Sequence, residues 1–223
     1  MSKIHTEKRV IHRMIPTEEE MLEQEQVIVP VQANQDPVYR FIKRTFDIVL
    51  ALVAGAVLLI PMLIVGLLVR IETKGPAIFK QKRLGKHGKE FRIYKFRTMR
   101  TEAPSELATR EFTDAHKYIT RIGKFLRRTS FDELPQLLNI IKGDMSFVGY
   151  RPVCVTETKL NGLRKEYGIF AVRPGLTGYA QVQGRDNIDH WTKAALDAEY
   201  VSKRSIKMDL WCLVKTFTVI FEG

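Results

Sequence analysis

The residues from Ile48 to Val69 form the longest uncharged stretch of the chain, and nearly all of them are apolar. About 20 apolar residues are enough to cross the hydrocarbon core of a bilayer. A helix in the core of a soluble protein would normally keep a polar face over this length, and this stretch has none. The pattern therefore predicts a membrane helix, with a buried core helix as the alternative.

Basic residues flank this stretch at both ends. They are Arg40, Lys43 and Arg44 before it, and Arg70, Lys74, Lys80, Lys82 and Arg83 after it. Basic flanks favour the cytoplasmic side of a membrane, so a single straight span would place one cluster on the unfavourable side. Pro61, in the middle of the stretch, removes a helical hydrogen bond and kinks or breaks the helix. We therefore expect a re-entrant membrane helix hairpin over residues 39–74, with a single span as the alternative.

The remaining pattern predicts a polar leader over residues 1–38 and a cytoplasmic catalytic domain with interfacial helices over residues 75–223. Apolar and basic residues alternate from Phe91 to Arg97, as expected of a half-buried strand. Its basic face would hold Arg92 and also Lys95 and Arg97. Helical patterns cover residues 119–142 (with a break), 153–167, 189–203 and 208–221, the last either at the membrane interface or in the core. The expected fold class is α+β, mostly helical, with a small β element.

The composition adds a formal net charge of +11. This charge indicates an anionic partner, such as anionic membrane lipid, a phosphorylated substrate or nucleic acid, unless the lysines are simply solvated. No nucleic-acid-binding motif is recognisable, and a nucleic-acid binder would not need the apolar stretch. The two cysteines, Cys154 and Cys212, have no metal-binding spacing and suit unpaired buried thiols.

Two adjacent carboxylates, Asp132 and Glu133, begin a predicted helix just after Arg127 and Arg128. One interpretation is structural, because Ser130 and Glu133 fit a capping box. The other is chemical: a carboxylate pair can hold Mg²⁺ together with substrate phosphates, and one carboxylate can attack phosphorus. Arginine side chains and the N-terminus of a helix would bind the phosphate charge.

Residues 130–149, read as SFDELPQLLNIIKGDMSFVG, closely resemble the signature of the bacterial sugar transferase family. Tyr94–Met99, Arg151–Pro152 and Val172–Arg185 match further blocks of that family, in the same order. Its members are monotopic phosphoglycosyl transferases that initiate exopolysaccharide, capsule and glycoprotein glycan synthesis. The resemblance covers the chain from about Tyr39 to its end, and it also implies the broken membrane helix.

The resemblance implies that Asp132 attacks the β-phosphate of a UDP-sugar, releases UMP and carries the sugar phosphate covalently. Polyprenyl (undecaprenyl) phosphate then accepts it, at the cytoplasmic face of the bacterial cell membrane. Glu133 would be the partner of Asp132, and both would bind Mg²⁺. The resemblance also assigns phosphate binding to Lys95, Arg127 and Arg151. It assigns nucleotide binding to Pro152, Arg173, Pro174, Gly175, Thr177, Gln181 and Arg185. It assigns structural roles to Pro61 and to Asp209, the latter as the partner of an arginine.

The chain departs from the family pattern at two positions. Tyr150 stands where a proline is common, which predicts a looser nucleotide loop, and Ile60 replaces a serine before Pro61, which leaves fewer donors to hold the bend. The alternative function is a non-catalytic adaptor that binds anionic lipid through its basic clusters at about 1 kcal/mol per cation. The sequence leaves open the sugar, the glycan pathway, the role of residues 1–38 and whether the chain is a homo-oligomer.

Overall fold

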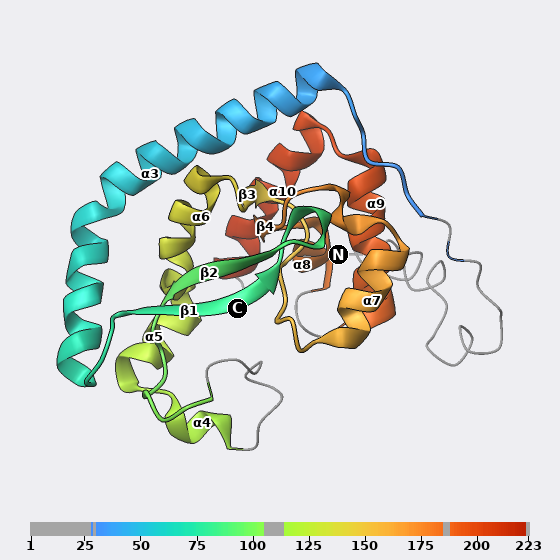
Figure 1. Cartoon of the computed structure of the whole chain (residues 1–223). Coiled ribbons are helices and arrows are strands. Elements are labelled where there is room, and N and C mark those ends of the chain that lie inside the picture. Colours follow the sequence, from blue (N-terminus) through green and yellow to red (C-terminus); the bar gives the residue numbers. More distant parts are fainter. Residues whose placement is uncertain (1–27, 29, 105–113, 185–187, 222–223) are drawn as a thin grey trace, which may run out of the picture.

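The computed structural model describes residues 28, 30–104, 114–184 and 188–221. Most of the predicted leader lies outside the described residues, and so does Arg185. The α-helices are α3 (Pro37–Glu72), α4 (Ala115–Tyr118), α5 (Arg121–Thr129), α6 (Leu137–Lys142), α7 (Thr158–Glu166), α8 (Tyr179–Gly184), α9 (His190–Lys203) and α10 (Ile206–Phe221). Short 3₁₀ helices are η1 (Lys86–Gly88), η3 (Phe131–Gln136) and η4 (Ile169–Ala171), and the strands are β1 (Ile78–Leu84), β2 (Glu90–Phe96), β3 (Ser146–Val148) and β4 (Gly175–Thr177). The predicted class, α+β and mostly helical, is confirmed (Figure 1).

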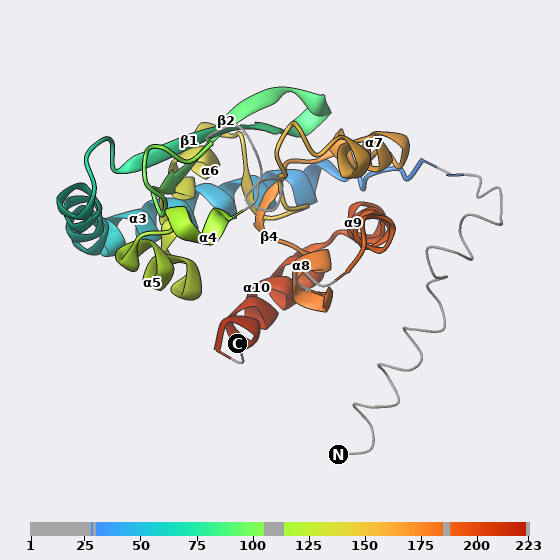
Figure 2. The same ribbon diagram turned by 90° about the horizontal axis from the view of Figure 1, so that it is seen from below.

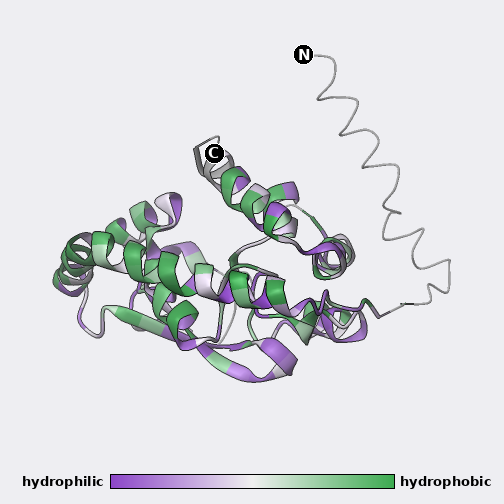
Figure 3. Cartoon of the chain, turned by 90° about the horizontal axis from the view of Figure 1, so that it is seen from above, coloured by the Kyte–Doolittle hydropathy of each residue, from purple (hydrophilic) through white to green (hydrophobic). Residues whose placement is uncertain are grey.

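Helix α3 contains the whole apolar stretch. The Asp36 side chain accepts a hydrogen bond from the Val38 N–H, and Pro37 occupies the first turn, where its missing N–H is not needed. The helix continues through Pro61, so the expected break is a bend within one helix, and Figure 1 shows α3 changing direction along its length. Only 6% of its most apolar window is buried, which excludes the core-helix alternative. In Figure 3 the ribbon of α3 has mostly the colour of hydrophobic residues.

The N-terminal half of α3 is fixed to the rest of the protein by charged side chains. Asp47 accepts hydrogen bonds from the Ser146 hydroxyl and the Phe147 N–H, both at 3.1 Å. Arg44 donates to the Ile140 and Ile141 carbonyls at 2.8 and 3.0 Å. These carbonyls belong to the last turn of α6, where a cation is favourable.

The C-terminal end of α3 is fixed to the same body. Arg97 donates to the Lys74 and Thr73 carbonyls at 2.6 and 2.8 Å. The Glu72 carboxylate accepts from the Arg121 N–H at 2.7 Å, at the first turn of α5. Both basic flanks of the apolar stretch therefore lie on one body, as a helix that returns to one membrane face requires.

Strands β1 and β2 form an antiparallel hairpin in which Ile78 pairs with Phe96 and Leu84 pairs with Glu90. The predicted basic face is only partly right: Arg92 is exposed, but Arg97 is buried against the end of α3 and Lys95 turns toward η3. In Figure 2 the hairpin lies at one edge of the molecule and α8, α9 and α10 at the other, with α6 and β4 between them. Helix α7 begins later than predicted, because Cys154 forms a β-bridge with Arg83.

Asn139, on α6, joins this helix to β2. Its side-chain amide forms hydrogen bonds with the main chain of β2, as a neighbouring strand would. Its side chain is 0% exposed, donates to the Arg92 carbonyl at 2.8 Å and accepts from the Tyr94 N–H at 3.0 Å. It also donates to Asp144 at 3.2 Å. The hairpin that carries Lys95 is thereby held at a fixed distance from the segment that carries Asp132 and Glu133.

We expect Asn139→Ala to lower the free energy of unfolding by about 2–3 kcal/mol, since it leaves the partly buried Arg92 carbonyl and Tyr94 N–H without their side-chain partner. Denaturant unfolding in detergent micelles, compared with Thr129→Ala at a half-buried position, measures this difference. A loss no larger than that of Thr129→Ala would contradict the bridging role of Asn139.

The parallel pair of β3 and β4 lies at the centre of the core. Ser146 pairs with Gly175 and Val148 with Thr177. Gly175 is required by close packing, because a Cβ atom there would lie 2.2 Å from the Gly149 nitrogen. The loop after β3, which carries Arg151, therefore starts from a tightly packed point.

Candidate active site

The two carboxylates occupy the tight turn between α5 and α6. Ser130 ends α5 in the left-handed conformation (φ 58°), and η3 begins at the next residue, with Pro135 inside it. The capping-box interpretation is wrong, because among the described residues Ser130 makes no side-chain cap bond in this conformation. Its carbonyl instead accepts the Glu133 N–H at 3.1 Å, which closes the turn.

Glu133 is clamped by two cations from distant parts of the chain. Lys95 donates to its Oε1 at 2.6 Å, and Arg151 donates to Oε1 at 2.6 Å and to Oε2 at 3.3 Å. Burial raises the pKa of this carboxyl, but Arg151 and Lys95 outweigh burial and hold the pKa well below its usual range. Glu133 is therefore ionised at neutral pH and rigidly oriented.

Asp132 has a different environment. Its side chain is only 9% exposed, and within the described part of the chain it accepts no hydrogen bond and forms no ion pair. Burial raises its pKa, and the charge of Lys95 opposes the rise more than those of Arg127 and Arg151 do. The result is a poorly solvated carboxylate whose oxygens are not engaged, which suits a nucleophile.

Arg127 completes the cationic surroundings. Its Nε donates to the Thr98 hydroxyl at 2.9 Å, which fixes the guanidinium beside the hairpin. The three predicted phosphate-binding residues thus come from β2, α5 and the loop after β3, and all of them act on Asp132 electrostatically. The structure places these cations around the carboxylate pair, and their role in phosphate binding stays a prediction.

The donor set is compatible with Mg²⁺. Within the described residues both Asp132 oxygens are available, and Glu133 Oε2 accepts only the longer bond from Arg151. One or two carboxylates together with substrate phosphates are the usual ligands of this ion. Within the residues that the structure describes, no group of three or more His, Cys, Asp or Glu side chains forms a metal cluster.

Comparison with known proteins assigns the family. A family model described as bacterial sugar transferase matches residues 38–223. The chain belongs to the bacterial sugar transferase family.

Curated relatives within the family fall into two sizes. The undecaprenyl-phosphate galactose phosphotransferase of Salmonella typhimurium is 38% identical over 197 residues, which cover 82% of this chain and 41% of that protein. The UDP-N-acetylgalactosamine-undecaprenyl-phosphate N-acetylgalactosaminephosphotransferase of Aeromonas hydrophila is 37% identical over 195 residues, 84% of this chain and 45% of that protein. The exopolysaccharide production protein PSS of Rhizobium leguminosarum bv. phaseoli is 42% identical over 179 residues, 76% and 90% respectively. The chain thus spans less than half the length of the larger relatives and most of the smaller one.

The residues that the family resemblance assigns to nucleotide binding mostly make framework contacts. Arg173 Nε donates to the Gly143 carbonyl at 2.7 Å, the Pro174 carbonyl accepts from the Ser146 N–H at 2.9 Å, and the Thr177 and Thr216 hydroxyls are 2.7 Å apart. Gly175 lies in β4, Gln181 lies half-buried on α8, and Pro152 is buried beside Arg151. Within the described residues no hydrogen bond or ion pair joins this group to Asp132, so nucleotide binding by it stays a prediction.

Tyr150 corrects the expectation of a loose loop. Its ring is fully buried and meets Phe170 edge-on at 5.6 Å, and its hydroxyl donates to the Leu84 carbonyl at 3.3 Å. The side chain therefore anchors the loop that a proline stiffens in many members of the family.

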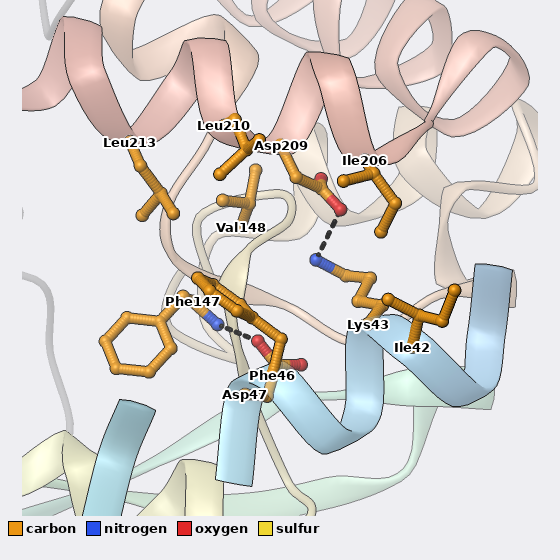
Figure 4. Close-up of a pocket in the computed structure, with 10 residues that line it drawn as sticks. All are labelled: Ile42, Lys43, Phe46, Asp47, Phe147, Val148, Ile206, Asp209, Leu210 and Leu213. Atoms are coloured by element: carbon orange, nitrogen blue, oxygen red, sulfur yellow. Dashed lines mark hydrogen bonds and ion pairs between the residues drawn. The ribbon is translucent and has the colours of Figure 1, made fainter. Parts of the chain in front are cut away.

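Among the described residues Asp209 pairs with a lysine and two tyrosines, not with an arginine as the family resemblance implied. Its Oδ2 accepts from Lys43 Nζ and the Tyr39 hydroxyl, both at 3.0 Å, and its Oδ1 accepts from the Tyr200 hydroxyl at 2.7 Å. Figure 4 shows Asp209 on α10 in contact with Lys43 on α3. Both residues line a cleft whose other side chains are mostly apolar, including Phe46. The lysine takes this place because it lies on the inward face of α3.

Tyr200 permits a pH test of this cluster. Burial and the Asp209 charge raise its pKa well above 10, so the folded protein keeps the phenolic proton where the unfolded chain, with a pKa near 10, releases it. Stability from this group is complete below about pH 10 and is lost as the pH rises further. Above pH 10 the unfolding free energy should fall as the pH rises. We expect this fall to be smaller in Tyr200→Phe than in the unmodified protein, by about 1.4 kcal/mol per pH unit. Urea titrations at several alkaline pH values measure it, and equal slopes for both proteins would contradict it.

Three buried polar residues of the site's framework are not apparent from the sequence: Asn139, Arg164 and Asp197. Charged residues within amphipathic helices such as α7 and α9 normally indicate the solvent-facing side. No sequence signal distinguishes Arg164 and Asp197 from such residues.

Proposed function

We propose that the protein transfers a sugar 1-phosphate from a UDP-sugar to undecaprenyl phosphate, releases UMP, and so initiates exopolysaccharide, capsule or another surface glycan. The observation that carries the proposal is the unengaged carboxylate of Asp132 among three cations, beside a clamped Glu133. Two relatives are named as undecaprenyl-phosphate sugar phosphotransferases and another as an exopolysaccharide production protein, which supports the same chemistry.

In the first step, an Asp132 oxygen attacks the β-phosphorus of the donor. A bond forms between aspartate and phosphorus, the bond from that phosphorus to the bridging oxygen breaks, and UMP leaves with the electron pair. In the second step, a phosphate oxygen of undecaprenyl phosphate attacks the same phosphorus. The bond from Asp132 to phosphorus breaks, and the free carboxylate is regenerated. Lys95, Arg127 and Arg151 offset the phosphate charge throughout, and the covalent step divides one difficult transfer into two.

Asp132 and Glu133 are the residues that would hold Mg²⁺. The ion would neutralise phosphate charge and orient the leaving group. Glu133 is prepared for this role by its low pKa, since a metal ligand must be deprotonated.

The membrane placement follows from α3. Its apolar side chains are exposed, both of its ends are fixed to one body, and its flanks are basic. We infer a monotopic protein at the cytoplasmic face of the bacterial membrane, in contact with anionic lipid. Thiol labelling of single cysteines introduced at Arg40 and Lys74 in inside-out vesicles should find both positions cytoplasmic, and labelling from opposite faces would rule out the re-entrant helix.

The reaction is tested with purified protein, Mg²⁺, undecaprenyl phosphate and a panel of UDP-sugars. We expect UMP release with at least one sugar, dependent on Mg²⁺. Release of UDP instead would show transfer of the sugar without its phosphate and would reject the proposal. No nucleotide release with any sugar would favour the lipid-binding adaptor, which does not need a buried carboxylate pair among its cations.

A further inference from the structure

A buried arginine lies directly behind the site. Arg164, on α7, is 1% exposed, and its partner Asp197, on α9, is 2% exposed. Arg164 donates from Nε and Nη2 to Asp197 Oδ2 at 2.9 and 2.6 Å. This ion pair joins α7 to α9, which pack against each other (Figure 1).

The third nitrogen of the same guanidinium faces the loop after β3, which carries Arg151 and is called the active-site loop below. Arg164 Nη1 donates to the Arg151 main-chain carbonyl at 2.8 Å, and the guanidinium carbon lies 5.0 Å from the centre of the Tyr150 ring. Arg164 therefore contacts two successive residues of the loop. The side chain of the second of them, Arg151, holds Glu133.

We propose that Arg164 is a positioning residue, which fixes the main chain of Arg151 so that its guanidinium meets Glu133 and the donor phosphates. The inference rests on the proposed function and adds to it a residue that does not touch substrate. The connection runs from Asp197 through Arg164 and Arg151 to Glu133, each link being a hydrogen bond of 2.6 to 2.8 Å.

Packing alone does not account for this arrangement. Burying two charges is expensive, and replacing a buried ion pair with apolar residues of similar size is often neutral or stabilising. A lysine would neutralise Asp197 equally well, but it lacks the planar fork that serves Asp197 and the Arg151 carbonyl together. The feature specific to arginine here is the third donor, and it is directed at the loop.

The test is a double-mutant cycle between the ion pair and Arg151. The variant Arg164→Met/Asp197→Leu removes both charges at once, so that no buried charge is left unpaired. We expect kcat/KM for the UDP-sugar to fall roughly 10- to 100-fold, because a small misplacement of a binding group has effects of this size. In an Arg151→Ala background, the same double change should alter kcat/KM by no more than about twofold.

The matched control is Lys43→Met/Asp209→Leu, which removes the ion pair described above between α3 and α10. Within the described residues neither Lys43 nor Asp209 forms a hydrogen bond or ion pair with Arg151, so we expect the effect of this change on kcat/KM to be the same factor in both backgrounds. Thermal unfolding of every variant shows whether each one folds. If Arg164→Met/Asp197→Leu does not fold, Arg164→Lys takes its place in the cycle, with the same expectation.

Equal losses from the Arg164 change with and without the Arg151 side chain would overturn the inference and reduce Arg164 to a structural role. That outcome is distinguishable from a failure of the proposed function. In the latter case the unmodified protein would release no UMP, whereas here it remains active and only the coupling is absent.

Discussion

Replacing Asp132 with asparagine should lower UMP release by at least about 10⁴-fold, the scale seen when a covalent nucleophile is removed. Asparagine has nearly the same shape but no anionic oxygen to attack phosphorus. Burial already disfavours the Asp132 charge and raises its pKa, so the folded state loses little when that charge is removed. We therefore expect the thermal midpoint of Asp132→Asn to equal or exceed that of the unmodified protein.

Glu133→Gln provides the matched comparison. Its neighbours Lys95 and Arg151 then lose the carboxylate that both of them bind, so this variant should lose stability as well as activity. Nucleotide release and thermal unfolding, measured on both variants, separate the two roles. Activity of Asp132→Asn within tenfold of the unmodified protein would exclude Asp132 as the nucleophile.

Replacing Asp209 with alanine should produce the largest loss of stability, about 3–5 kcal/mol, as expected when one member of a buried ion pair is removed. Lys43 would keep its charge without a partner, and the Tyr39 hydroxyl would lose its acceptor. The Tyr200 hydroxyl would keep only the Val148 carbonyl, at 3.1 Å. Because these contacts join α10 to α3, the anchor between the membrane helix and the catalytic body should loosen first. Denaturant unfolding in one detergent measures the loss.

The control for Asp209→Ala is Lys43→Met/Asp209→Leu, which removes both charges together. We expect it to recover most of the lost stability, since no charge remains buried without a partner. A loss below about 1 kcal/mol for Asp209→Ala would mean that water replaces the carboxylate without penalty, contrary to the burial of this cluster.

The features that were predictable from the sequence are those that leave a local pattern. The uncharged stretch around Pro61 indicated a membrane helix, and alternation from Phe91 indicated a strand. The adjacent Asp132 and Glu133 marked the site, but from the residues alone they fitted a helix cap equally well. The family resemblance supplied the reaction, which the physical pattern did not.

The contacts that give the two carboxylates different properties join distant positions. Lys95 reaches Glu133 from a strand 38 positions earlier in the chain, and Lys43 meets Asp209 across 166 positions. Such pairs depend on how elements pack, and no periodicity records them. The same limit explains why Asp209 was assigned an arginine, and why Arg164 was not recognised: a charge within a helix gives no sign of its burial.

The covalent half-reaction tests the central claim most directly. The purified protein is incubated with Mg²⁺ and an accepted UDP-sugar in the absence of undecaprenyl phosphate, and its intact mass and the released nucleotide are measured together. We predict a gain of one sugar phosphate, one UMP released per modified protein, attachment at Asp132 in the peptide map, and no gain for Asp132→Asn. An unmodified mass, with UMP appearing only when the lipid acceptor is added, would contradict a covalent intermediate and with it the role assigned to Asp132.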